Sequence, residues 1–195
     1  DDYKKTVKSV ANSTAIYKGE PVPFLYEPIF YTQSDIERFN EIGRILISIT
    51  NKVTKKYIES PKYREKFGYP KLLEELILIN QGYDVNVPIG RFDIFYGGDD
   101  NFKFCEFNTD GSSAMNEDNV LARILLESKA LEEMKKSYDI EYFELIYKWV
   151  DESIKIFNKY DSTIDRPNVA IVDFKESGTP YEFEEFKIKD IVLKE

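Results

Sequence analysis

Apolar side chains recur every three or four residues in the second quarter of the chain and predict a long amphipathic helix there. That spacing places them on one helical face: Ile36, Phe39, Ile42, Leu46, Ile49 and Val53. Ser34 and Glu37 have the spacing of a capping box, which predicts where this helix begins. Pro70 and Gly82 bound a second predicted helix over residues 70–81.

The pattern then changes to short aromatic runs, RFDIFY at residues 91–96 and FKFCEFN at residues 102–108. Runs of this length, rich in aromatic residues, predict strands. The intervening letters GGDDN are a turn signal, so an antiparallel hairpin is expected. Apolar spacing further along predicts helices over about 116–136 and 141–160.

These elements predict an α+β fold class, an antiparallel aromatic-rich hairpin packed with long helices. Residues 1–33 are expected to form an irregular arm, and residues 34–165 an α+β region that binds substrate and metal. NVAIVDF at 168–174 is typical of a buried parallel strand, so residues 166–195 are expected to begin a βαβ unit. One strand and one short helix cannot bury both faces of such a unit. We therefore expect the chain to be a portion of a longer protein.

Composition narrows the possible chemistry. The net charge of -9 argues against nucleic acid and anionic membranes as partners. No apolar run approaches the roughly 20 residues that span a bilayer. A single cysteine, Cys105, excludes an internal disulfide and is typical of a reducing cytoplasm, which is the expected location. The absence of histidine excludes Ser-His-Asp triads, Cys-His hydrolases and histidine-ligated metals.

Polar side chains interrupt both strands of the predicted hairpin at alternate positions. Arg91 and Asp93 share one face of the first strand, and Glu106 and Asn108 share one face of the second. A four-residue loop, 98–101, would place Asp93 opposite Glu106 and Arg91 opposite Asn108. A five-residue loop would send the two pairs to opposite faces. The sequence permits both arrangements.

In the first arrangement, three oxygen-bearing side chains would cluster beside an arginine. Asp93 and Glu106 would repel each other unless a positive charge lay between them, and a magnesium ion would supply it. Asn108 would complete the set of hard ligands. Arg91 offers a planar fork of donors suited to phosphate or carboxylate. The loop 109–113 would present backbone N–H groups and hydroxyls to an anion just before a helix.

A plainer interpretation accounts for the same letters. Alternating polar residues are also what the solvent face of a half-exposed hairpin carries, and an Asp-Gly pair followed by serines is a common turn before a helix.

Residues 90–117, GRFDIFYGGDDNFKFCEFNTDGSSAMNE, resemble the amino-terminal part of the synthetase region in the glutathionylspermidine synthase family. This family is a circularly permuted ATP-grasp group, and the resemblance extends over about residues 20–190. It implies a ligase that uses ATP and Mg2+ to form an acyl phosphate on a small-molecule carboxylate. A small-molecule amine then attacks to form an amide bond.

Position by position, the resemblance implies roles for the polar residues of the hairpin. Asp93, Glu106 and Asn108 match the magnesium-binding positions. Arg91 matches the arginine that contacts the transferred phosphoryl group, which makes it the candidate catalytic residue and a substrate contact. Arg91 and Asp93 would together bind the ATP cofactor.

The serine loop carries the remaining implied site. Ser113 matches a loop position near the acyl substrate, and Ser112 is a second candidate substrate contact. Gly111 stands where the glutathionylspermidine enzymes are expected to have serine, which puts glutathione itself in doubt as substrate. The amidase domain of bifunctional members needs histidine, so that activity is not expected. In the permuted order most of the ATP pocket follows Asn168, so this portion alone is expected to be inactive.

Three functions stay open at this stage. The first is the ATP-dependent carbon-nitrogen ligase that the resemblance implies. The second is a non-catalytic binding or assembly module that retains the fold. The third is a structural domain with an acidic surface hairpin, in which Asp93→Asn and Glu106→Gln would relieve repulsion and raise stability.

Overall fold

The computed structural model describes residues 2–98, 101–109 and 114–170. The fold is mixed α+β, with two small antiparallel hairpins and seven α-helices in the described residues. The chain divides into two compact units. Among the described residues, the first unit comprises 2–29, 114–154 and 163–170, and the second comprises 30–98, 101–109 and 155–162. No helix in these ranges is long and apolar enough to cross a bilayer.

The first unit begins with a helix, α1 (Asp2–Ala11), where an irregular segment was expected. That expectation is wrong for these residues because Thr6 and Val10, one helical turn apart, are both buried. The Thr6 hydroxyl also donates to the Asp2 carbonyl at 3.1 Å. A short hairpin follows, made of β1 (Ile16–Tyr17) and β2 (Glu20–Pro21).

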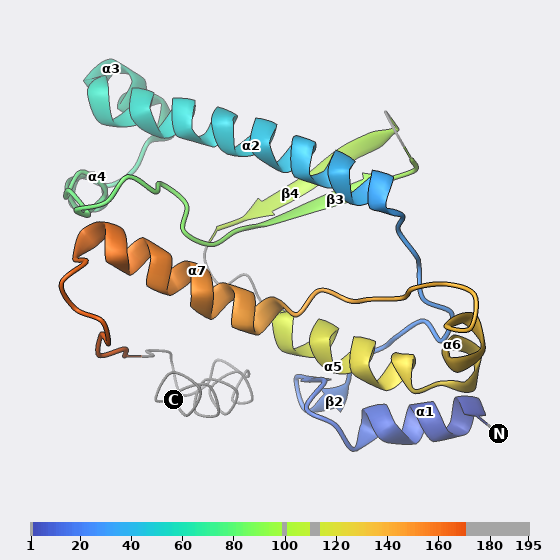
Figure 1. Cartoon of the computed structure of the whole chain (residues 1–195). Coiled ribbons are helices and arrows are strands. Elements are labelled where there is room, and N and C mark those ends of the chain that lie inside the picture. Colours follow the sequence, from blue (N-terminus) through green and yellow to red (C-terminus); the bar gives the residue numbers. More distant parts are fainter. Residues whose placement is uncertain (1, 99–100, 110–113, 171–195) are drawn as a thin grey trace. The chain divides into compact units, whose positions relative to one another are not determined.

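Three further helices complete the first unit: α5 (Met115–Leu126), α6 (Lys129–Met134) and the start of α7 (Leu145–Tyr160) (Figure 1). The single helix expected over 116–136 is interrupted at Ser128, whose hydroxyl caps α6 by accepting from the Leu131 amide at 3.3 Å. The buried apolar residues of the unit come from α1, the loop before β1, α5, α6 and α7, and form its core: Val10, Ala15, Val120, Leu125, Leu131 and Ile146.

Two buried asparagines tie α5 to its neighbours. Asn116 accepts from the Thr14 hydroxyl at 3.2 Å and donates to the Thr14 carbonyl at 2.8 Å. Asn119 donates to Glu144 at 2.8 Å and accepts from the Leu145 amide at 3.1 Å. Because Asn119 takes up the first amide of α7, that helix begins at residue 145 and not at the expected 141.

The second unit is organised on α2 (Gln33–Glu59), the long helix that the apolar spacing predicts. Its capping box differs from the expected one. Thr32 accepts from the Asp35 amide at 3.3 Å, and Asp35 accepts in return from the Thr32 amide at 2.8 Å. Thr32 and Asp35 have the same spacing as Ser34 and Glu37, so the sequence pattern alone does not separate the two boxes.

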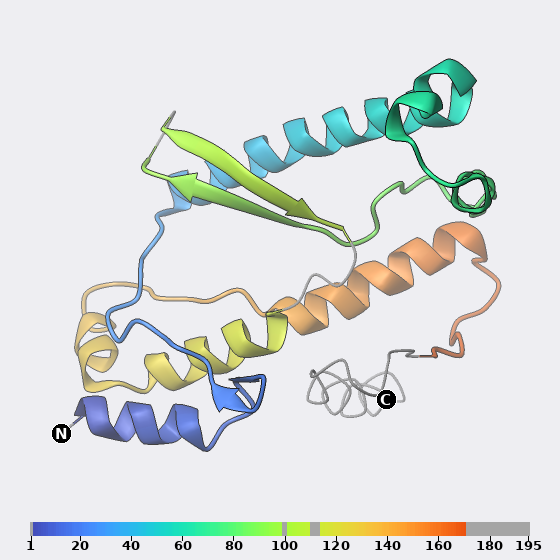
Figure 2. The ribbon, with the colours of Figure 1, turned by 180° about the vertical axis from the view of Figure 1, so that it is seen from behind.

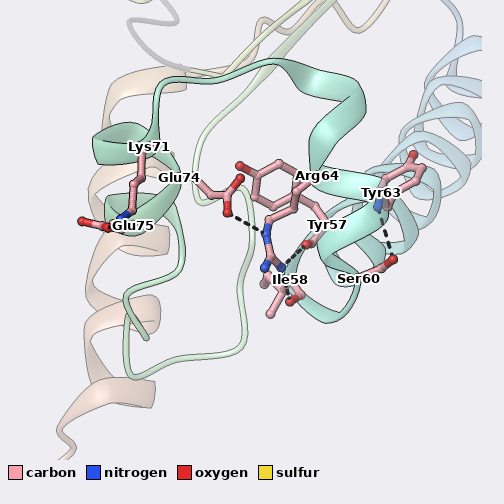
Figure 3. A network of polar contacts seen from close by, with 8 residues as sticks. All are labelled: Tyr57, Ile58, Ser60, Tyr63, Arg64, Lys71, Glu74 and Glu75. Carbon is pink, nitrogen blue, oxygen red and sulfur yellow. Dashed lines mark hydrogen bonds and ion pairs between the residues drawn. The ribbon is translucent and has the colours of Figure 1, made fainter.

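Arg64 fixes the carboxyl end of α2, as Figure 3 shows. It lies at the end of α3 (Pro61–Arg64), and its guanidinium donates to the carbonyls of Tyr57 at 3.0 Å and Ile58 at 2.9 Å. These carbonyls lack partners inside the helix. The Arg64 Nε atom lies 3.2 Å from a carboxylate oxygen of Glu74, so one side chain holds together two segments of the unit.

The helix predicted over 70–81 is shorter in the structure. A 3₁₀ turn, η1 (Glu65–Phe67), leads to α4 (Lys71–Ile77). The next residues form turns because their side chains bond to the backbone. Asn80 accepts from the Gly82 amide at 2.8 Å, and Gln81 donates to the carbonyls of Tyr83 at 3.1 Å and Val85 at 2.9 Å.

The predicted hairpin is present with the predicted bounds, as β3 (Arg91–Tyr96) and β4 (Phe102–Asn108). It lies alongside the amino-terminal half of α2 (Figures 1 and 2). The Tyr96 hydroxyl donates to Asp35 at 2.7 Å, and its ring meets that of Phe39 edge-on at 4.7 Å. Arg38 lies 5.5 Å from the ring of Phe102. These contacts fix the strand ends nearest the turn onto α2.

The carboxy-terminal predictions are largely untested. Residues 168–170 form no strand in the structure, and 171–174 with the following helix signal lie outside the described residues. The βαβ unit therefore stays a prediction, as does the division of the chain at residues 33 and 165.

Candidate polar site on the hairpin

The pairing of β3 with β4 contains one irregularity, and it decides which side chains face each other. Near the turn Tyr96 pairs with Phe102, which leaves five residues between the paired positions, the second of the two loop lengths that the sequence permits. The register then shifts between Asp93 and Ile94, because Cys105 is an extra residue in β4. Beyond this β-bulge, Asp93 pairs with Glu106. A five-residue loop alone would have separated them; the bulge restores the pairing that a four-residue loop would have given.

The four predicted side chains consequently lie on one face. Arg91 pairs with Asn108 and Asp93 with Glu106, and the alternation of side chains along β3 carries Phe95 to the same side. This surface is called here the polar face of the hairpin. The opposite face is aromatic, with Phe92 and Phe107 stacked at 4.1 Å.

Arg91 is bound to Asp93 by two parallel hydrogen bonds. Its Nε atom donates to Asp93 Oδ1 at 2.8 Å, and its Nη2 atom donates to Asp93 Oδ2 at 3.2 Å. The same Nη2 atom lies 3.8 Å from Glu106 Oε1. The positive charge that the two carboxylates were expected to require is therefore supplied by Arg91 itself in this structure.

Asn108 completes the cluster. Its Nδ2 atom donates to Glu106 Oε1 at 2.9 Å, so the amide nitrogen faces the carboxylate. The side chains are partly open to solvent, with exposed fractions of 39% for Arg91, 33% for Asp93 and 56% for Glu106. The cluster is thus ordered by its own contacts and accessible to a ligand.

The electrostatics follow from these contacts. Hydrogen bonding from Arg91 holds the pKa of Asp93 below its ordinary value, against a smaller opposing effect of partial desolvation. The same bond raises the pKa of Arg91. Asp93 is therefore ionised and Arg91 charged at neutral pH.

The side chains of the cluster are of the kinds that bind hard divalent cations. Asp93 and Glu106 provide carboxylate oxygens and Asn108 an amide oxygen, all ligand types that magnesium accepts. Among the described residues no group of three or more Asp, Glu, Cys or His side chains could hold a metal. Any metal at the polar face would therefore use these two carboxylates and the amide, with water or ligand oxygens for the rest.

The two predicted serine contacts, Ser112 and Ser113, lie outside the described residues, together with Gly111. The first described residue after them, Ala114, has a φ of 77° in the left-handed region. An L-residue with a Cβ atom pays about 1–2 kcal/mol for this conformation, which glycine would adopt freely. The loop thus enters α5 through a strained backbone position.

A shallow hollow on α2 was not anticipated from the sequence. Its lining comes entirely from one helix: Arg44, Ile47, Ser48, Asn51, Lys52 and Lys55. Cations on a single helical surface have no opposing wall to enclose a ligand, so this hollow is a weaker candidate than the polar face.

Sequence reasoning overlooked one residue of the polar face. Phe95 has an exposed side chain, at 71%, two residues along β3 from Asp93. The alternation of Arg91, Asp93 and Phe95 already placed it on that side. It was overlooked because aromatic residues in strands are usually buried.

The chain is similar to a known protein family over most of its length. The family model described as glutathionylspermidine synthase preATP-grasp matches residues 3–173. No curated protein and no solved structure matches the chain. The matched range contains the whole hairpin and all four side chains of the cluster.

Proposed function

The chain belongs to the glutathionylspermidine synthase preATP-grasp family, and from this membership we propose that it forms part of a carboxylate-amine ligase. The family is one of ATP-grasp ligases, which use ATP and magnesium. The proposed reaction joins a small-molecule carboxylate to a small-molecule amine. The polar face of the hairpin would provide one side of the reaction centre.

The observation that supports this proposal is the register of the hairpin. A bulge at Cys105 brings Glu106 opposite Asp93 although the turn alone would not. Bulges are frequent beside active sites, where they redirect side chains. Here the redirected side chain meets the carboxylate and arginine that the family resemblance assigns to metal and phosphate binding.

In the proposed reaction, an oxygen of the substrate carboxylate attacks the terminal phosphorus of ATP. The bond to ADP breaks and an acyl phosphate forms. The amine then attacks the acyl carbon, expels phosphate, loses a proton and leaves an amide. Phosphoryl transfer of this kind depends on positioning and charge stabilisation more than on covalent chemistry by the protein.

Each residue of the cluster has a proposed part. Asp93, Glu106 and Asn108 would hold magnesium, which when bound would neutralise charge on the phosphates. Arg91 would turn from Asp93 to the transferred phosphoryl group, because metal binding would occupy the Asp93 oxygens that it now contacts at 2.8 and 3.2 Å. Its two-pronged guanidinium suits phosphate as it suits carboxylate. Ser112 and Ser113 stay candidate substrate contacts.

ATP turnover in the full-length protein tests this proposal. Asp93→Asn and Glu106→Gln should each lower turnover by about a hundredfold or more, the scale of losing one preorganised charged contact. Asp84→Asn is the matched control, since Asp84 is an exposed carboxylate whose ion-pair partner, Lys159 at 2.8 Å, is not a member of the cluster. Unchanged turnover in both cluster variants would eliminate the ligase mechanism.

A binding or assembly module that retains the fold is the second candidate. The open, solvent-accessible cluster is compatible with binding alone. This candidate predicts that wild-type protein binds magnesium and nucleotide without turning ATP over when candidate carboxylates and amines are supplied. Wild-type turnover would exclude it.

A further inference from the structure

Phe95 differs from every other phenylalanine of the hairpin. Phe92 stacks on Phe107, and Phe102 meets Phe104 edge-on at 5.7 Å. Within the described residues, the ring of Phe95 packs against no other ring. At 71% it also has the largest exposed fraction among the large hydrophobic residues that the structure describes.

Its surroundings are polar, which is unusual for a ring on a strand. Phe95 lies on the polar face, two residues from Asp93 and four from Arg91. Its partner across the ladder is Lys103, which is also exposed. Single exposed hydrophobic residues are common on protein surfaces. A ring that pairs with a cation and lies one step along the strand from a cluster suited to a metal and a phosphate is a more specific combination.

The spacing matches a ligand with two chemically distinct ends. Residues two apart on a strand are separated by about 6.6 Å, so the ring lies one step beyond the carboxylates toward the turn. A nucleotide has its phosphates and its base separated by a ribose. With the phosphates at Asp93 and Arg91, the nucleoside end can reach the ring, while Lys103 adds a positive charge beside the phosphate chain.

We propose that Phe95 is a nucleotide-binding residue whose ring contacts the nucleoside end of ATP held at the polar face. This inference rests on the proposed function, since it places the phosphates at the metal cluster. Stacking of a base on an aromatic side chain tolerates differences in base identity because every base presents a π face. It would give the hairpin a role in recognising the nucleoside as well as the phosphates.

The test compares two ligands in the full-length protein by isothermal titration with magnesium present. Mg·ATP carries the nucleoside, and magnesium tripolyphosphate lacks it. Phe95→Ala should weaken Mg·ATP binding about 5- to 150-fold, the range found for the removal of stacking side chains, and leave tripolyphosphate binding unchanged. Phe104→Ala is the control, because Phe104 is 46% exposed on the opposite face of the same hairpin and should alter neither affinity.

The remaining outcomes separate this inference from the proposed function. Asp93→Asn should weaken both ligands. If it does while Phe95→Ala weakens neither, the metal cluster stands and the role of Phe95 is overturned. Equal weakening of both ligands by Phe95→Ala would also overturn it, because the ring would then act through the fold. If wild-type protein binds neither ligand, or Asp93→Asn changes neither affinity, the proposed function fails and the inference with it.

Discussion

Arg91 is the residue on which the electrostatics of the hairpin depend. It donates two hydrogen bonds to Asp93 and lies within 3.8 Å of Glu106, so one guanidinium balances two carboxylates in a chain of net charge -9. In this arrangement the charge of the two carboxylates is balanced by Arg91, without a metal. In the proposed function, a metal at Asp93 would have to displace Arg91, so metal binding and release of the arginine would be a single exchange.

The pH dependence of this pair has a definite sign. The pKa of Asp93 is lowered in the folded chain because Arg91 hydrogen bonds to the ionised carboxylate. The pair therefore contributes stability above the unfolded pKa of about 3.9, and this is lost as the pH falls through the lower, folded value. Carboxyl resonances followed by NMR should give Asp93 a midpoint below about 3.9 in wild-type protein.

Arg91→Gln should move that midpoint upward, because the stabilising charge is removed while Glu106 stays nearby. Asp84 provides an internal control, since its own lowered pKa is caused by Lys159 and should not change. An Asp93 midpoint that is the same with and without Arg91 would contradict the assigned ion pair.

Among the elements, α2 allows the observed and the expected capping residues to be compared directly. Thr32→Ala should lower the free energy of unfolding by about 1 kcal/mol, because the Asp35 amide loses its acceptor. Ser34→Ala should change it by less than about 0.5 kcal/mol, since Ser34 is exposed and does not cap the helix. Urea denaturation of both variants measures the difference. A larger loss for Ser34→Ala would reinstate the capping box expected from the sequence.

Strands were easier to predict than helix ends. The bounds 91–96 and 102–108 follow from aromatic runs divided by glycines, and Gly98 indeed takes a φ of +94° in the turn. Helix ends depended on side chains whose partners lie far along the chain. Asn119 sets the start of α7 through a bond to residue 145, which no local spacing reveals.

The sequence predicts which polar side chains share a face of each strand, but not how the two strands are paired. Alternation assigns Arg91 with Asp93, and Glu106 with Asn108, to common faces of their own strands. Whether the faces coincide depends on the turn and the bulge together, and a bulge at Cys105 has no signal in the letters FKFCEFN. Phe95 was missed because a ring in an aromatic strand is usually buried.

At the scale of the whole molecule, complete burial is unevenly distributed. Among the described residues, most buried apolar side chains lie in the first unit, chiefly on α1, α5, α6 and α7, whereas Ile42 and Tyr57 are those of the second. On α4 even the large side chains are exposed, such as Leu72 at 68% and Leu76 at 55%. Segments with little buried apolar surface open at lower free energy.

Hydrogen exchange should therefore separate the two units. Amides in the middle of α5 are expected to exchange at least about tenfold more slowly than those of α4, because opening α5 exposes Val120 and Leu125. Mass spectrometry of the native protein over a time course measures both segments at once. Equal protection would mean that the units open together, against the division drawn from their contacts.

The bulge at Cys105 also has a consequence for how sequences of this hairpin should be aligned. Within the described ladder, Cys105 is the position in β4 that has no counterpart in β3. Removing it would leave every observed pair intact, from Tyr96 with Phe102 to Arg91 with Asn108. An alignment that forbids gaps inside strands would shift Glu106 and Asn108 by one place relative to a homologue with a regular ladder. A one-residue gap at position 105 keeps the metal-binding candidates in register.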